Sequence, residues 1–138
     1  MSDKAIERVA AYARRRINLG AWSEELLQAW LTWYQAHGLL TVIEDGRHNV
    51  IAFAAARPTT RKGAEDHNSI VEEGDVMAVD LFAADTPVAR TALWRLMVES
   101  IQPREWIAYC RNKYADRPTL YSFQHFARNV SKLPLSHG

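Results

Sequence analysis

The sequence has little of several features that would commit it to a particular class of protein. It contains one cysteine, Cys110, which excludes both a disulfide framework and a zinc site made of thiolates. No apolar stretch approaches the roughly 18 residues that a membrane-spanning helix needs. The five histidines are scattered without pairing at helical spacing, so we expect no metal site. The charged N-terminal segment lacks an apolar signal region, and we therefore expect a cytoplasmic protein and no membrane partner.

What is present is typical of one soluble domain over residues 1–138. Hydrophobic residues make up 48% of the chain and charged residues 24%, and five tryptophans supply bulk for a core. The net charge of +1 hides an asymmetry, because the two ends are basic and residues 21–101 are acidic. Basic ends suit a phosphate-bearing ligand, but solvated surfaces explain the same pattern. Without an RNA-binding signature we do not expect nucleic acid as a partner.

The first third of the sequence predicts two helices. Apolar residues recur at helical spacing over residues 3–17, and residues 18–20 then break the pattern. Ser23 is the expected N-cap of the second helix, because the two glutamates after it suit the positive end of the helix dipole. Gly38 fits the position just after that helix. We expect the tryptophans and leucines of this helix to belong to the core.

A β-hairpin is expected next. Residues 39–44 and 50–56 are strand-like, and residues 45–49 between them are rich in turn formers. Residues 59–68 are polar, and a loop of this length in a small domain is either a functional flap or simply mobile. Residues 75–84 are mostly apolar, which is typical of a central buried strand.

The last part of the chain predicts a helix, a strand and a helix. Thr86 as N-cap and Pro87 at the first helical position begin a helix that Pro103 ends. Residues 106–110 are predicted to form a short strand and residues 118–129 a final helix. The order α-α-β-β-β-α-β-α predicts an α/β (α+β) fold, with a mixed, mostly antiparallel central sheet flanked by helices on both faces.

The turn between the central strand and the helix after it is the most informative element. A strand that runs into a capped helix N-terminus directs backbone N–H groups and a partial positive charge at one point, which suits a phosphate. Arg90 and the hydroxyls of Thr86 and Thr91 suit an anion, whereas Asp85 opposes one. A plain capped helix explains the same residues without a ligand.

Two segments near the C-terminus resemble motifs of a known family. They read NKYA at 112–115 and LYSFQHF at 120–126. Together with the order of elements, they resemble the GNAT (GCN5-related N-acetyltransferase) superfamily over nearly the whole chain. That family often shows Asn-x-x-Ala and then Leu-Tyr-x-x-x-Gly-Phe. Here His125 replaces the glycine, and two residues are inserted between the halves.

The resemblance implies an N-acyltransferase that moves an acyl group from a thioester to an amine. The donor would be acetyl-CoA or another acyl thioester, such as one on an acyl carrier protein, and the acceptor an amine or a protein that the sequence does not identify. The sheet would splay open beside the central strand to admit the donor. The implied site comprises Tyr121 as general acid, Asn112 to orient the donor, Phe82 and Ala83 for the pantetheine arm, and Val88, Ala89, Arg90 and Thr91 for the phosphates.

A second hypothesis keeps the fold without the reaction. In the family an Arg-Gly-x-Gly-x-Gly loop holds the pyrophosphate of coenzyme A, and here Ala89, Thr91 and Leu93 replace its three glycines. The added side chains favour an inactive GNAT-like binding or structural module, such as a phage-related or accessory protein. A homodimer is compatible with either hypothesis.

No general base stands out in the sequence. Met77 occupies the position at which the family often has a carboxylate, and Asp80 is expected on the opposite face of the strand. His67, Glu72 and Glu73 precede the strand and are further candidates, of which none is favoured. Water can accept the proton from an amine that is already partly neutral.

Overall fold

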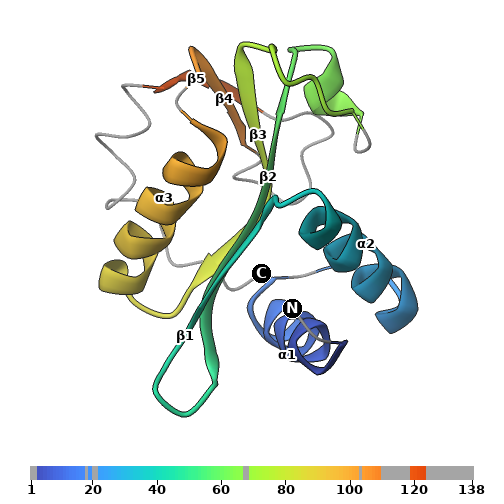
Figure 1. Ribbon diagram of the computed structural model, residues 1–138, viewed down its shortest axis with the longest axis vertical. Coiled ribbons are helices and arrows are strands. Elements are labelled where there is room, and N and C mark those ends of the chain that lie inside the picture. Colours follow the sequence, from blue (N-terminus) through green and yellow to red (C-terminus); the bar gives the residue numbers. More distant parts are fainter. Residues whose placement is uncertain are drawn as a thin grey trace.

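The computed structural model describes residues 3–17, 19, 22–66, 69–102, 104–109 and 119–123. Within them the chain forms three α-helices, one short 3₁₀ helix and five strands (Figure 1). In chain order the elements are α1 (Asp3–Arg16), α2 (Glu24–Ala36), β1 (Leu40–Glu44), β2 (Val50–Thr59), η1 (Gly63–Glu65), β3 (Val76–Ala84), α3 (Pro87–Ile101), β4 (Trp106–Tyr109) and β5 (Thr119–Ser122).

The five strands form one sheet in the order β1-β2-β3-β4-β5. β2 is antiparallel to both β1 and β3, β3 runs parallel to β4, and β5 is antiparallel to β4. The expected class, a mixed and mostly antiparallel sheet combined with α-helices, is therefore confirmed. Figure 1 views this sheet nearly edge-on, with α3 on one side and α1 and α2 on the other.

The core is divided into layers by β2 and β3. Because side chains alternate along a strand, Ala52 and Ala54 pack with Leu93 and other residues of α3. Phe53, which lies between those alanines, packs on the opposite face with α1 and α2. Small alanines on one face and a large ring on the other thus set how closely each helix approaches the sheet.

Local capping signals explain where two helices begin. The Ser23 hydroxyl accepts a hydrogen bond from the N–H of Leu26 at 3.0 Å, so Ser23 caps α2 as expected. Gly38 follows the end of α2 with φ 69°, a conformation that favours glycine. Thr86 caps α3 in the same way through the N–H of Ala89, and Pro87 is its first residue.

β2 is longer than the sequence predicts, because it continues through Pro58 to Thr59. Proline interrupts a strand only where its missing N–H is needed for pairing. The carbonyl of Pro58 accepts a bond from the N–H of Val71 at 2.9 Å, and the strand pairs with β3 as far as Val76. The segment after β2 therefore lies beside the end of β2, at the position that β1 would occupy if it were longer.

The helix predicted over residues 118–129 is wrong for residues 119–122. These residues form β5, which pairs antiparallel with β4, Leu120 lying opposite Ala108. Threonine and tyrosine favour strands, and pairing with a strand that lies near in space overrides a local apolar pattern. Residues 124–129 lie outside the described residues.

Candidate functional site

The central strand β3 extends past its pairing with β4. Residues 76–79 pair in parallel with residues 106–109, whereas β3 continues to Ala84. Of the residues that the structure describes, none pairs with residues 80–84 on the β4 side. The second half of β3 therefore has one edge without a strand partner in this part of the chain.

The hydrogen-bond register decides which backbone groups point to that open edge. The N–H of Asp85 donates to the carbonyl of Ile51 at 2.9 Å, so these two residues form a hydrogen-bonded pair. Such pairs alternate along antiparallel strands, so Ala83 directs its N–H and C=O toward β2. Phe82 and Ala84 direct theirs to the open edge. Of the two predicted residues, the register directs the backbone groups of Phe82 to the open edge and those of Ala83 to β2.

A bulge at Asp80 marks the start of the open segment. Ala55 pairs with Leu81 and Ala56 pairs with Val79, so Asp80 is the extra residue in β3. A bulge redirects the strand and increases its twist. It therefore falls at the point where the described pairing with β4 ends.

The start of α3 uses part of its own backbone donors. The N–H of Ala89 donates to the Thr86 hydroxyl at 3.1 Å, and the N–H of Arg90 donates to the Thr86 carbonyl at 2.9 Å. Pro87 has no N–H. Among residues 86–90, the N–H groups of Thr86 and Val88 are those for which the structure shows no acceptor. The helix N-terminus thus offers two backbone donors.

The side chains predicted to hold an anion at this helix are bonded to the helix or buried. The Thr91 hydroxyl donates to the carbonyl of Pro87 at 3.1 Å. Arg90 is buried, with 4% of its surface exposed, whereas Val88 is 81% exposed. Val88, Ala89, Arg90 and Thr91 therefore lie together at one helix end, where the Thr91 hydroxyl is bonded to the helix backbone and Arg90 is buried.

Asp85 joins the start of α3 to the end of α1. Its Oδ1 lies 2.9 Å from the donating hydroxyl of Tyr12 and 2.7 Å from the guanidinium of Arg16. The same hydroxyl is 2.9 Å from the carbonyl of Ile51. Burial, with the bond to Asp85, raises the pKa of Tyr12 to about 12, so the phenol remains a neutral donor. The positive charge of Arg16 therefore balances the negative charge of Asp85, which by itself would repel an anion.

Arg57, Asp80 and Tyr34 form a buried polar network on the α2 face of the sheet. Arg57 is fully buried, and its Nε donates to Oδ2 of Asp80 at 2.8 Å. The Tyr34 hydroxyl donates to the same oxygen at 2.5 Å. Burial, followed by the charge of Asp80, raises the pKa of Tyr34 well above its usual range. The network therefore consists of one ion pair and a permanently neutral phenol.

The remaining donors of Arg57 hold the loop after β2. They bond to the carbonyls of Gly63 at 2.8 Å, Ser69 at 2.6 Å and Ala64 at 3.2 Å, and to Oδ1 of Asp80 at 3.4 Å. All five N–H groups of the guanidinium are thus used. The sequence left open whether this loop is a flap or mobile. Its described residues are fastened to the sheet by one arginine.

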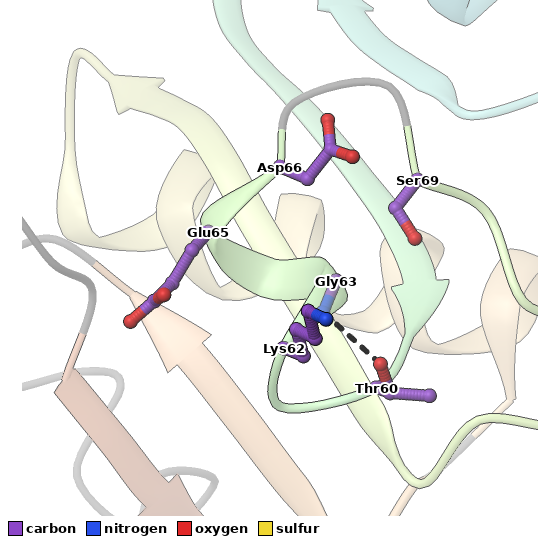
Figure 2. A pocket seen from close by; sticks show the side chains of 6 residues that line it. All are labelled: Thr60, Lys62, Gly63, Glu65, Asp66 and Ser69. Atoms are coloured by element: carbon purple, nitrogen blue, oxygen red, sulfur yellow. Dashed lines mark hydrogen bonds between the residues drawn. The ribbon is translucent and has the colours of Figure 1, made fainter.

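The same loop carries a shallow depression of about 400 Å³ (Figure 2). Its walls mix hydroxyls with charges of both signs, and they come from Thr60, Lys62, Gly63, Glu65, Asp66 and Ser69. In Figure 2 the Asp66 side chain is directed toward Ser69, whereas Glu65 points away. The depression therefore has no single sign of charge to select a ligand.

The side chains of three predicted residues lie outside the described part of the chain. Asn112 and His67 lie outside the described residues. The backbone of Tyr121 lies on β5 opposite Ile107, and its side chain is likewise outside the described part. Of the other candidates for a base, Asp80 is held in its ion pair, and Glu72 and Glu73 are exposed before β3.

Sequence reasoning missed Arg57, Tyr34 and Tyr12. The signal for Arg57 was available, because an arginine in an otherwise apolar strand requires buried partners. No signal connected it with Tyr34, since the two residues come from different elements. Tyr12 lies in the apolar stripe of α1 and its hydroxyl gives no indication of a partner 73 residues away.

In the described ranges there is no group of three or more histidine, cysteine, aspartate or glutamate residues that could hold a metal ion. Among these residues there is also no helix with the length and apolar character that crossing a bilayer requires. No protein-family model matches the sequence, and neither does any curated protein or solved structure.

Proposed function

We propose that this protein is an acyltransferase with a GNAT-like fold, which transfers an acetyl or other acyl group from a thioester to an amine. One observation carries the proposal: the second half of β3 has an open edge beside β4 in the described part of the chain. Phe82 and Ala84 direct backbone N–H and C=O groups to that edge. The pantetheine arm of a thioester donor contains amides that can pair with such groups.

The order of elements supports the same proposal. Apart from the short η1, the described order is α-α-β-β-β-α-β-β: its first seven elements are of the types in the order on which the resemblance rests, and the eighth is a strand in place of a helix. β3 and β4 run parallel and are joined through α3. The start of α3 therefore lies at the same end of β3 as the open edge, where the donor's phosphate would bind.

In the proposed reaction a neutral amine attacks the thioester carbonyl. A C–N bond forms, the C–S bond breaks and the leaving thiolate takes a proton. Tyr121 is the proposed source of this proton, because a phenol with a pKa of about 10 is protonated near neutral pH. Asn112 is proposed to orient the donor. The proton lost by the amine passes to water, since no carboxylate is assigned as a base, and a proton from water restores the Tyr121 phenol.

The start of α3 bears on the identity of the donor. The two available N–H groups, those of Thr86 and Val88, can bond to one phosphate but are few for the diphosphate of coenzyme A. An acyl group on the phosphopantetheine arm of a carrier protein has one phosphate. We therefore propose such a donor beside acetyl-CoA.

The same observation favours a second candidate, an inactive binding or structural module. If neither type of donor binds, the protein has the proposed fold but does not catalyse the reaction. Titration calorimetry and thermal shift with millimolar acetyl-CoA, and in parallel with acetyl-phosphopantetheine, separate the two candidates. The acyltransferase predicts binding of at least one donor, and the module predicts binding of neither.

A matched pair of variants tests the role of the β3 edge. Ala84→Pro removes an N–H that points to the open edge, and the β2–β3 ladder does not use this N–H. Ala84→Ser keeps it. The proposal predicts that donor binding is lost in Ala84→Pro and kept in Ala84→Ser, at comparable melting temperatures. Equal donor affinities in the two variants contradict it. Full acyl transfer by Tyr121→Phe would show that the Tyr121 phenol is not the general acid.

A further inference from the structure

β1 (Leu40–Glu44) forms one outer edge of the sheet. This edge is poorly protected against pairing with another strand. No strand in the described part of the chain pairs with its outer side. Four of its five residues are half-buried, whereas nine of the ten residues of β2 are buried. Natural proteins protect such edges with lysine, proline or bulges. β1 has neither lysine nor proline, and its one irregularity lies at its last residue.

The hydrogen-bond register identifies the backbone groups on this edge. The N–H of Ala56 donates to the carbonyl of Leu39 at 3.3 Å, so Leu39 belongs to a hydrogen-bonded pair with β2. Alternation along the strands then directs Thr41 and Ile43 toward β2. It leaves the N–H and C=O groups of Leu40 and Val42 pointing outward, away from the sheet.

Beyond a bulge, the end of β1 continues the same outward pattern. The N–H of Asp45 donates to the carbonyl of Asn49 at 2.9 Å, so Asp45 faces the hairpin partner. Its neighbour Glu44 therefore directs its backbone groups outward. Outward-facing donors and acceptors thus follow at every second residue over the whole of β1.

We propose that a second copy of this chain pairs with β1 in antiparallel orientation to form a symmetric dimer with a continuous sheet. With the twofold axis at Val42, this residue pairs with Val42 of the second copy, and Leu40 pairs with Glu44. Every outward N–H then meets an outward C=O. This self-complementarity is what a twofold interface requires, because the same surface is used on both copies.

The charges at the ends of β1 favour the antiparallel orientation. The one charged side chain of β1, Glu44, lies 3.5 Å from the guanidinium of Arg8 in its own chain, so its charge is balanced there and does not by itself select a basic peptide. Antiparallel pairing also places the acidic end, Glu44 and Asp45, against Leu40 and Leu39, which carry no charge. Parallel pairing would bring the two acidic ends together.

The test is the mass of the full chain in solution, measured by sedimentation or light scattering over a range of concentrations. The proposal predicts a concentration-dependent doubling of mass. Val42→Pro removes an outward N–H that the β1–β2 pairing does not use, so this variant is expected to fold and to be monomeric. Val42→Thr keeps the N–H and is expected to dimerise. A monomeric wild type, or a dimeric Val42→Pro, overturns the proposal.

Amide hydrogen exchange keeps the test decisive if Val42→Pro does not fold. In the wild-type protein, the amides of Leu40, Val42 and Glu44 should become protected as the protein concentration rises. The amide of Asp45, which bonds within the hairpin, is the internal control and should not change with concentration. If the three outward amides exchange at the same rate at all concentrations, β1 is not the interface.

Discussion

The Arg57 network makes the sharpest prediction about stability. Arg57→Met removes a fully buried guanidinium and leaves the carboxylate of Asp80, whose side chain is 15% exposed, without its cation. Breaking a buried pair from one side costs about 3–5 kcal/mol. Each of the three loop carbonyls that loses its donor costs about 1 kcal/mol or more. The total approaches the whole stability of an ordinary domain, which is about 5–15 kcal/mol.

Urea unfolding followed by tryptophan fluorescence measures this effect. Arg57→Met is expected to be unfolded in buffer or to have a much lower midpoint than the wild type. Arg95→Met is the control, because Arg95 is exposed on α3 and such changes cost less than about 0.5 kcal/mol. If Arg57→Met lowers the free energy of unfolding by less than about 1 kcal/mol, the reasoning is refuted, because polar groups this buried lose more than that when their partners are removed.

A double variant separates charge from packing. In Arg57→Met with Asp80→Leu both charges are gone, and replacing a whole buried pair by apolar residues is often far less costly than breaking it. The double variant should therefore be more stable than Arg57→Met alone. If the loss of stability in the double variant equals the sum of the losses in Arg57→Met and Asp80→Leu, the pair does not act as a unit.

Three further predictions follow from local contacts. Tyr12 has its pKa raised to about 12, so its contribution to stability is complete below pH 10 and is lost as the pH rises to about 12. Tyr12→Phe should reduce the alkaline dependence of the melting temperature, of which the part due to Tyr34 remains. The N–H groups of Asn49 and Arg47 hold the pKa of Asp45 below its usual value, so its contribution is present above about pH 4 and is lost as the pH falls further. Asp45→Asn should flatten that acid dependence in the same assay. Gly63→Ala should lower the melting temperature by several degrees, because a Cβ there would collide with the hydroxyls of Thr59 and Ser69, and an unchanged value would contradict the packing of the loop.

The sequence predicts those parts of the fold that depend on local signals. Ser23 and Thr86 identify the starts of α2 and α3, because a cap bonds to a backbone N–H only three residues away. The hairpin turn at residues 45–49 is predicted for the same reason. β5 could not be predicted this way, since its strand conformation depends on pairing with β4.

In the candidate site, too, local sequence signals predict some features and pairing between distant segments decides others. Phe82 could be singled out because it lies on the central strand, but whether Phe82 or Ala83 faces the open edge depends on the pairing register. That register shifts at the bulge at Asp80, which no local pattern in the sequence indicates. The Arg57 network depends on Tyr34, which is 46 residues from Asp80 along the chain, so it becomes evident only from the fold.

The central claim is that a thioester donor lies along the open edge of β3. The most direct measurement is an NMR titration of the protein, with backbone amides assigned, using acetyl-phosphopantetheine and acetyl-CoA. The claim predicts that the amide signals of Phe82 and Ala84 shift together on binding, with that of Val88 following when the phosphate is present. Saturable shifts confined to other parts of the protein, or no shifts at millimolar donor, would contradict it.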